Sequence, residues 1–201
     1  MLTIYGAARS RAVRVLWMAA ELGIAYEHKN WLPRSPETKT PDYKALNANS
    51  RVPTIDDDGF ILSESMAINF YLAKKHKSAL FPSDPKNEAL AMQWCLWETD
   101  RLDRQLVNYV RHSSELPEAE RKPDVAKAMW EECTQSFDVL DAALSKNQWL
   151  AGPSFSVGDL NVAGALLRAL SLDISKWPHV KAWLDKCWAR PAAQKAKAMR
   201  G

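Results

Sequence analysis

The chain has 201 residues, which is enough for one large domain or two small ones. Its net charge of +3 is too small to favour a nucleic-acid partner. No stretch approaches the ~20 apolar residues of a membrane span, and the first residues lack the basic start and apolar run of a signal peptide. We therefore expect a cytoplasmic protein without a nucleic-acid or membrane partner.

Three cysteines, Cys95, Cys133 and Cys187, lie far apart and form no Cys-x-x-Cys pair. This spacing argues against a disulfide framework and against a zinc site, so no metal is predicted. Each cysteine falls within a helical pattern, where we expect a small buried apolar side chain.

The first part of the chain predicts a β-α-β unit. Residues 2–5 read as a short strand, and a helix follows, with Ser10 as a plausible N-cap and Gly23 as its C-terminal stop. Residues 25–31 read as a second strand. The polar, proline-containing stretch 32–49 predicts a loop with a short turn of helix.

The stretch from Asn49 to Ser65 organises the rest of the chain. Pro53 cannot donate to a strand ladder and belongs at a strand start or edge. Asp58-Gly59 between two apolar runs predicts a hairpin. Ser63-Glu64-Ser65 predicts the start of a helix over 66–76, and a helix start beside an edge strand suits a small anionic, peptide-like ligand.

This order of β-α-β and then β-β-α is that of a thioredoxin-like domain, which we assign to residues 1–76. The lack of a Cys-x-x-Cys near residue 10 argues against thiol–disulfide exchange. Residues 77–85 read as a proline-containing linker, and residues 86–201 as an all-helical domain. Within it, Ser156 and Asp159 resemble a capping box at the start of a largely apolar, central helix.

The ordered set of Val-Pro, acidic-Gly turn and Glu-Ser resembles the glutathione site of cytosolic glutathione transferases, in the bacterial theta-like or beta-like types. The resemblance covers nearly the whole chain. It implies the fold of that family, an α+β thioredoxin-like domain followed by an all-α helical bundle. In the family the residue before the proline pairs main chain to main chain with the cysteinyl unit of glutathione, and the proline is cis. Carried over, these residues are Val52 and Pro53.

The family's Glu-Ser pair holds the γ-glutamyl amine and carboxylate, which implies roles for Glu64 and Ser65. Glu64 could instead complement a helix dipole. The glycyl carboxylate needs cations, for which Arg51 and Lys39 are candidates. Arg51 immediately precedes Val52, whereas Lys39 could equally be a solvated surface lysine.

The thiol of glutathione must be stabilised as a thiolate, since the thiolate is the nucleophile. Ser10, with Arg11 beside it at the first helix start, has the right composition for this. Members of the family with a catalytic serine often place it three or four residues before an Arg-Ala-Val run, which here is Arg11-Ala12-Val13. That position is Ala7 or Ala8, which have no hydroxyl, so Ser10 could be only an N-cap. Tyr5 is the second candidate, and backbone N–H groups with Arg11 are the third.

An apolar electrophile would contact the helical domain, where Tyr109 and His112 are three residues apart and share a face. The resemblance implies a glutathione transferase that conjugates glutathione to this electrophile and forms a two-fold homodimer. Two alternatives remain open. One is the same fold with other glutathione chemistry, such as peroxide reduction, isomerisation or dehalogenation. The other is a non-catalytic member of the family that binds a partner protein or a hydrophobic ligand.

Overall fold

The computed structural model describes residues 1–200, which divide into two compact units. The first unit contains residues 1–81 and also the chain from residue 188 onward, and the second is Pro82–Cys187. We predicted that residues 86–201 form one helical domain. The contacts instead group the last helix with the sheet-containing unit, because that helix packs on the first one.

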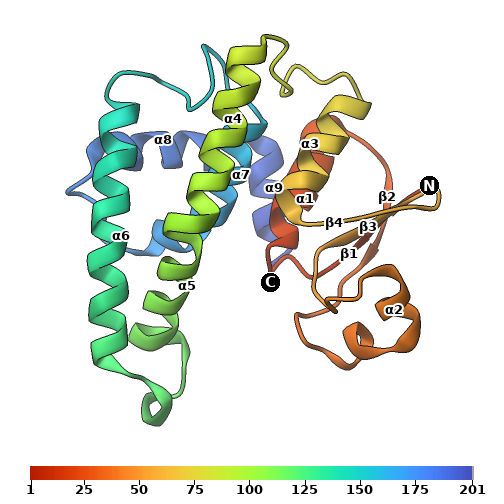
Figure 1. Cartoon of the computed structure of the whole chain (residues 1–201), viewed down its shortest axis with the longest axis horizontal. Helices are drawn as coiled ribbons and strands as arrows, with labels where there is room; N and C mark the ends of the chain where they lie inside the picture. Colours follow the sequence, from red (N-terminus) through yellow and green to blue (C-terminus); the bar gives the residue numbers. More distant parts are fainter. Residues whose placement is uncertain (201) are drawn as a thin grey trace. The chain divides into compact units, whose positions relative to one another are not determined.

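A four-stranded sheet forms the centre of the first unit, in the order β2-β1-β3-β4 (Figure 1). The strands are β1 (Leu2–Tyr5), β2 (Tyr26–Lys29), β3 (Thr54–Asp57) and β4 (Phe60–Ser63). β1 pairs in parallel with β2 and antiparallel with β3, and β3 pairs antiparallel with β4. Asp58 and Gly59 both have positive φ, 53° and 90°, as the predicted two-residue hairpin requires. The thioredoxin-like order is thereby confirmed.

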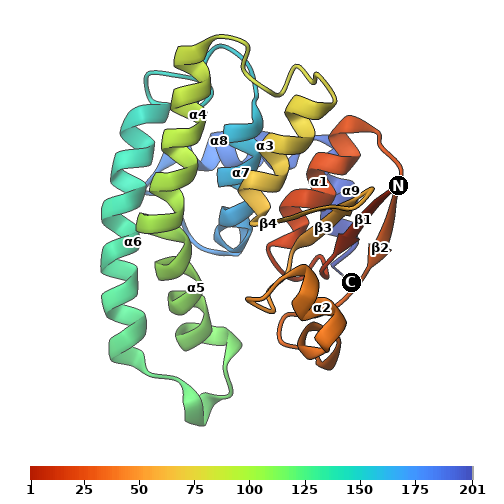
Figure 2. The ribbon, with the colours of Figure 1, turned by 45° about the vertical axis from the view of Figure 1, so that its right-hand side comes forward.

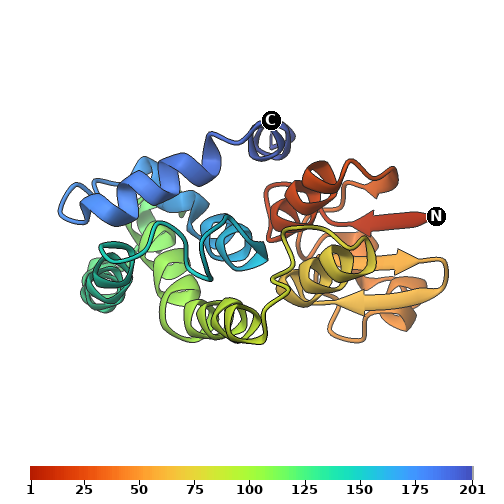
Figure 3. The ribbon, with the colours of Figure 1, turned by 90° about the horizontal axis from the view of Figure 1, so that it is seen from above.

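The helices of the first unit are α1 (Ala12–Leu22), α2 (Pro41–Leu46), α3 (Ser65–Lys75) and α9 (Pro191–Ala198), with a 3-10 helix at Pro36–Lys39. α1 begins two residues later than its predicted N-cap, Ser10. It ends at Gly23, whose left-handed conformation (φ 62°) stops the helix as predicted. α1 and α3 pack against each other and against the sheet (Figure 2). Seen from above, α9 lies beside α1 (Figure 3).

The second unit is entirely helical. Its α-helices are α4 (Pro85–Glu98), α5 (Arg104–Val110), α6 (Pro123–Leu144), α7 (Val157–Ala165) and α8 (Pro178–Trp188), the last residue of which belongs to the first unit. A π-helical segment at Thr99–Asp103 joins α4 to α5, and a second one at Arg111–Glu115 follows α5. Two 3-10 helices, Glu118–Glu120 and Leu166–Ser171, complete it.

The predicted central helix is α7, every residue of which is buried. The capping box at its start is present: Gly158 N–H donates to Ser156 Oγ (3.2 Å), and Ser156 N–H donates to Asp159 Oδ2 (3.0 Å). Asp159 stands where a capping box usually has Glu or Gln, and it still accepts the hydrogen bond from the N–H of Ser156. This cap fixes the direction in which α7 enters the core of the helical unit.

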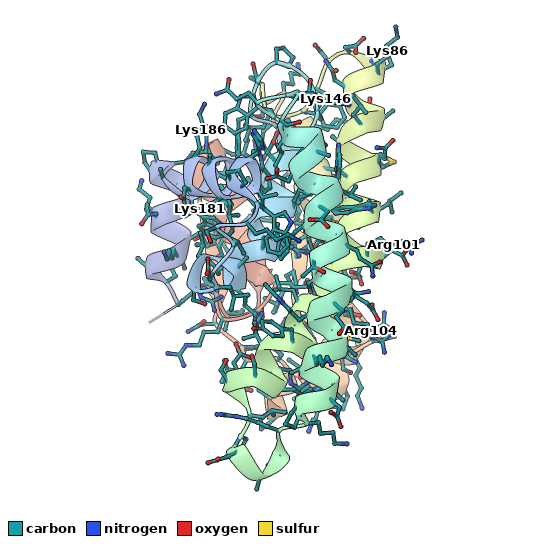
Figure 4. All side chains as sticks on the ribbon, turned by 90° about the vertical axis from the view of Figure 1, so that its left-hand side faces the viewer. Lys86, Arg101, Arg104, Lys146, Lys181 and Lys186 are labelled. Carbon is teal, nitrogen blue, oxygen red and sulfur yellow. The ribbon has the colours of Figure 1, made fainter. Side chains whose placement is uncertain are left out.

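The three cysteines are buried free thiols, as predicted, one each in α4, α6 and α8. Burial raises the pKa of the Cys133 thiol to about 12, with a smaller contribution from Glu132, so this thiol is unreactive. Among the described residues, no helix combines the length and the apolar character needed to cross a membrane. Figure 4 shows basic side chains distributed over several elements of the helical unit rather than gathered in one cluster: Lys86, Arg101, Arg104, Lys146, Lys181 and Lys186.

Candidate functional site

The Val52–Pro53 peptide bond is cis and lies against the loop that joins β1 to α1. Gly6, in that loop, has a φ of +134°, which favours glycine. A Cβ built on Gly6 would stand 2.9 Å from Val52 Cβ and 3.5 Å from Pro53 Cα. The absence of a side chain at Gly6 therefore allows the β1–α1 loop and the Val52–Pro53 step to meet.

A buried polar network fixes the backbone just ahead of Val52. The carbonyl of Arg51 accepts hydrogen bonds from Tyr43 Oη (2.6 Å) and Asn47 Nδ2 (3.0 Å). Asn47 Nδ2 also donates to Thr54 Oγ1 (3.0 Å), which lies 2.9 Å from Tyr43 Oη. Sequence reasoning missed this network, although an Asn just ahead of the motif and a Thr just after the proline were signals for it. The network holds the chain on both sides of Val52.

Val52 itself is half-buried and lies two positions before Thr54, the first residue of β3. Within residues 1–200, neither its N–H nor its C=O is hydrogen-bonded to another group of the protein. An extended ligand can therefore pair with this residue main chain to main chain, as an additional strand would.

The start of α3 lies at the end of β4 and is built around Glu64 and Ser65. Glu64 occupies the N-cap position with a strained backbone, φ 71° and ψ 110°, and its side chain makes no capping hydrogen bond. Glu64 therefore does not cap α3, and the positive end of the helix dipole at Ser65 suits a carboxylate ligand. Strain of this kind is often found where a side chain is held out for function.

Ser65 is buried, and its Oγ accepts a hydrogen bond from Arg14 Nη1 (3.1 Å) of α1. Arg14 is only 3% exposed, and its carbonyl accepts from Asn69 Nδ2 of α3 (3.1 Å). Since Ser65 Oγ accepts from Arg14, its own hydrogen is available for a ligand carboxylate. Arg14 was missed from the sequence, although a charge within the apolar pattern of α1 was a signal for it.

Ser10 lies in the β1–α1 loop and uses its hydroxyl locally. Its Oγ donates to the carbonyl of Ala7 (2.7 Å) and accepts from the N–H of Ala12 (3.1 Å). The second bond satisfies a first-turn donor of α1, so Ser10 acts as a cap although Arg11 occupies the N-cap position. In this arrangement the hydroxyl hydrogen points to Ala7, and donation to a thiolate requires a rotation of the side chain.

Tyr5, at the end of β1, packs within an aromatic cluster. Its ring centroid lies 5.2 Å from that of Trp31 and 5.7 Å from that of Tyr43, and the latter two are 5.4 Å apart. Burial, followed by the Asp56 charge, raises the pKa of Tyr5 above its ordinary value. Tyr5 therefore stays protonated at neutral pH and supports the same Tyr43 that holds Arg51.

The predicted cations Arg11, Lys39 and Arg51 are all exposed, with Lys39 at the end of the 3-10 helix Pro36–Lys39. In the helical unit, Tyr109 stacks on Trp130 of α6 with ring centroids 4.6 Å apart. His112 lies in the second π-helical segment, and its Nδ1 accepts from the N–H of Lys122 (3.3 Å). Among the described residues, no cluster of His, Cys, Asp and Glu has the composition of a metal site.

Both parts of the chain match known protein families. Residues 1–74 match the model of the glutathione S-transferase N-terminal domain, and residues 101–191 match that of the C-terminal domain. Glutathione S-transferase GstB of Escherichia coli (strain K12) is 30% identical over 202 residues, with 97% of each chain covered. Glutathione S-transferase 3 of Zea mays is 32% identical, over 98% of this chain and 93% of its own.

Among solved structures, one similar fold is the theta class glutathione S-transferase of Xanthomonas axonopodis pv. citri, with glutathione bound. It has a TM-score of 0.91 and 33% sequence identity, and the match covers 97% of this chain and 96% of that chain. The similarity therefore extends across both units and includes the stretch from Val52 to Ser65.

Proposed function

We propose, given that this chain belongs to the glutathione S-transferase family of enzymes, that its first unit binds glutathione along Val52 and at the start of α3. The bound thiol gives up its proton, is stabilised as a thiolate and attacks an apolar electrophile; a carbon–sulfur bond forms and the leaving group, a halide in the case of an aryl halide, departs with the electron pair of the broken bond. Two observations carry this proposal. Within residues 1–200, the N–H and C=O of Val52 have no hydrogen-bond partner in the protein, and the buried Ser65 Oγ accepts from Arg14. The glutathione complex of the Xanthomonas relative supports the same ligand.

Each part of glutathione has a chemical counterpart in this unit. The cysteinyl main chain pairs with Val52, and the γ-glutamyl carboxylate accepts from Ser65 Oγ and from first-turn N–H groups of α3. Glu64, exposed beside them, pairs with the γ-glutamyl amine. Arg51, with Lys39 as a second candidate, pairs with the glycyl carboxylate.

The pKa of the glutathione thiol must be lowered for the thiol to react as a thiolate at neutral pH. An ordinary cysteine thiol has a pKa of about 8.5, and lowering it by ~2 units requires about 2.7 kcal/mol of preferential thiolate stabilisation. Ser10 can supply a donor once its hydroxyl turns from Ala7. The N–H groups at the start of α1 and the adjacent Arg11 supply the remainder of the positive potential.

The electrophile is apolar, and Tyr109 and His112 of the helical unit are its proposed contacts.

We also propose a two-fold homodimer. Large apolar side chains are exposed on two helices of the helical unit: Met92 (48%) and Leu96 (66%) on α4, and Val139 (51%) on α6. Val139 also lines a groove of 590 Å³ together with Trp97 and Arg101. A second copy covering these side chains removes them from water.

A second candidate function keeps the same glutathione site with different chemistry, such as peroxide reduction, isomerisation or dehalogenation. The observation that favours it is the hydrogen bond from Ser10 to Ala7, because it commits the best hydroxyl to the protein rather than to a sulfur. Activity towards a hydroperoxide that exceeds activity towards an aryl halide would favour this candidate.

The proposal is tested by calorimetric titration with glutathione, followed by turnover with a generic aryl halide. We expect binding by the wild type and at least tenfold weaker binding by Ser65→Ala, with Ser145→Ala, an exposed hydroxyl at the end of α6, as the matched control. A wild-type protein that binds no glutathione would overturn the proposal and favour a non-catalytic binding protein. Equal turnover by Ser10→Ala and wild type would assign thiolate stabilisation to the backbone and Arg11.

A further inference from the structure

The helix α9 lies antiparallel to α1 and is anchored at both ends. At its beginning, Arg190 donates to both carboxylate oxygens of Glu21, through Nε (2.6 Å) and Nη2 (2.8 Å). Trp17 Nε1 donates to the same Glu21 (2.9 Å), and the rings of Trp17 and Trp188 lie 4.7 Å apart. These contacts hold the start of α9 at the C-terminal end of α1.

The other end of α9 reaches the β1–α1 loop. Arg200 Nη1 donates to the carbonyl of Ala8 (2.9 Å), and Arg9 Nε donates to the carbonyl of Arg200 (2.6 Å). These two reciprocal hydrogen bonds join residues that are 191 and 192 positions apart in the sequence. Ala8 is 1% exposed, so its carbonyl is held in a packed environment. We call this pair of hydrogen bonds the Arg200 clamp.

The clamped residues adjoin the groups that would face the glutathione thiol. Ala8 lies between Ala7, whose carbonyl accepts from Ser10, and Ser10 itself, which caps α1. The loop is held on its other side by the bond from Ala7 N–H to the Trp31 carbonyl (2.7 Å). Donors stabilise a developing or full negative charge only when they are held at the right position and direction. A charged donor such as Arg200 also makes a stronger hydrogen bond than a neutral one.

We propose that Arg200 is a positioning residue for the thiolate, which it influences by holding the Ala8 carbonyl and with it the loop that carries Ser10 and the first N–H groups of α1. Arg200 does not touch the ligand in this scheme. The inference rests on the proposed function, since it concerns how the bound thiol is stabilised. Loss of the clamp lets the loop move, so the donors reach the sulfur less often and the thiol pKa rises.

Arg200→Gln tests the proposal, with Arg200→Lys as the conservative variant and Arg190→Gln as the matched control. Arg190→Gln loosens the same helix at its other end, where Arg190 bonds to Glu21 of α1. The readout is the pKa of the enzyme-bound thiol, from thiolate absorbance and from the pH dependence of kcat/KM. For Arg200→Gln we expect a pKa about 0.5–1 unit higher and kcat/KM about three- to tenfold lower below that pKa, converging with wild type at high pH. Arg200→Lys should recover part of the shift, and Arg190→Gln should keep the wild-type pKa.

Amide hydrogen exchange of Ser10 and Ala12 provides a readout that does not need glutathione. We expect faster exchange in Arg200→Gln than in Arg190→Gln at equal overall stability. A wild-type thiol pKa in Arg200→Gln, or the same shift in both variants, would overturn the inference while leaving the proposed function intact. A wild type that binds no glutathione would overturn the proposed function, and unchanged exchange in Arg200→Gln would then overturn the clamp as well.

Discussion

Gly6 and Val52 approach so closely that a methyl group on Gly6 would stand 2.9 Å from Val52 Cβ. The same methyl group would lie 2.9 Å from Ala12 Cβ, in the first turn of α1. One position without a side chain thus brings the loop of the proposed thiolate donors against the proposed docking residue of glutathione. The two halves of the site depend on this contact for their spacing.

Gly6→Ala should therefore damage both stability and binding. The backbone at φ +134° is strained for alanine, and the methyl group must displace Val52 or Ala12. We expect a loss of about 2–4 kcal/mol in the free energy of unfolding, measured with urea, and a loss of glutathione affinity of about tenfold or more. Gly23→Ala is the control, because Gly23 also has positive φ but nothing within 4 Å of an added Cβ. It should lower stability by about 1 kcal/mol and leave affinity unchanged.

Glu64 and Ser65 are neighbours with opposite environments, so their variants should separate stability from binding. Glu64 is exposed and makes no cap, so Glu64→Gln should change the free energy of unfolding by less than about 0.5 kcal/mol while weakening glutathione binding. Ser65→Ala removes the acceptor of the buried Arg14 Nη1 and should lower stability by about 1–3 kcal/mol as well as affinity. Calorimetric titration and urea unfolding measure the two effects. Glutathione affinity that is unchanged in Glu64→Gln would remove Glu64 from the site.

Much of this arrangement could be predicted from the sequence, because it rests on local signals. The Asp58-Gly59 turn, the Gly23 stop and the Ser156 cap each depend on the conformational preference of a few consecutive residues. The predicted thioredoxin-like order followed by a helical bundle was correct for the same reason.

What the sequence could not supply depends on contacts between distant residues. The bond from Arg14 to Ser65 spans 51 positions, and the bond from Arg200 to Ala8 spans 192. No local pattern places α9 with the sheet-containing unit. The two π-helical segments were also missed, and we have no physical account of why they fall at Thr99–Asp103 and Arg111–Glu115.

Asp57 of β3 gives the first unit a specific acid sensitivity. Burial acts to raise the pKa of this carboxyl, but the hydrogen bonds from Lys75 and Tyr71 outweigh it, and its pKa lies below the ordinary value. Its stabilising contribution is therefore present above the unfolded pKa of about 3.9 and is lost as the pH falls through the lower folded pKa. Asp57→Asn should be about 1.5–3 kcal/mol less stable than wild type at pH 7, with a smaller difference below about pH 3.

Urea unfolding from pH 2.5 to pH 8 measures this dependence. The control is Asp58→Asn, since the Asp58 carboxylate is 76% exposed and its partner is the amino group of Met1, so little change is expected. An Asp57→Asn stability curve parallel to that of the wild type over the whole pH range would contradict the argument.

Substitution of Asp159 should strongly lower the stability of the helical unit. Its two carboxylate oxygens accept from four donors: Leu150 N–H (2.9 Å), Trp183 Nε1 (2.9 Å), Ser156 N–H (3.0 Å) and Ser156 Oγ (3.1 Å). In Asp159→Asn, the new NH₂ group must face one pair of these donors, and buried hydrogen bonds are lost. We expect a loss of about 3 kcal/mol, against about 1 kcal/mol for Ser156→Ala, which removes the cap and only one of the four donors to Asp159. Equal losses in the two variants would mean that Asp159 acts only as a capping residue.

Leu96, the most exposed of the apolar side chains on α4, tests the proposed homodimer. If a second copy covers it, a charge at this position must be buried without a partner, which opposes association. Leu96→Glu should therefore shift the molar mass measured by light scattering from twice the chain mass towards 22.7 kDa at micromolar concentration. Leu32→Glu is the matched control, because Leu32 is similarly exposed (53%) but belongs to the other unit. A wild type that is monomeric, or a Leu96→Glu variant that dimerises as tightly as Leu32→Glu, would rule out this surface as the dimer contact.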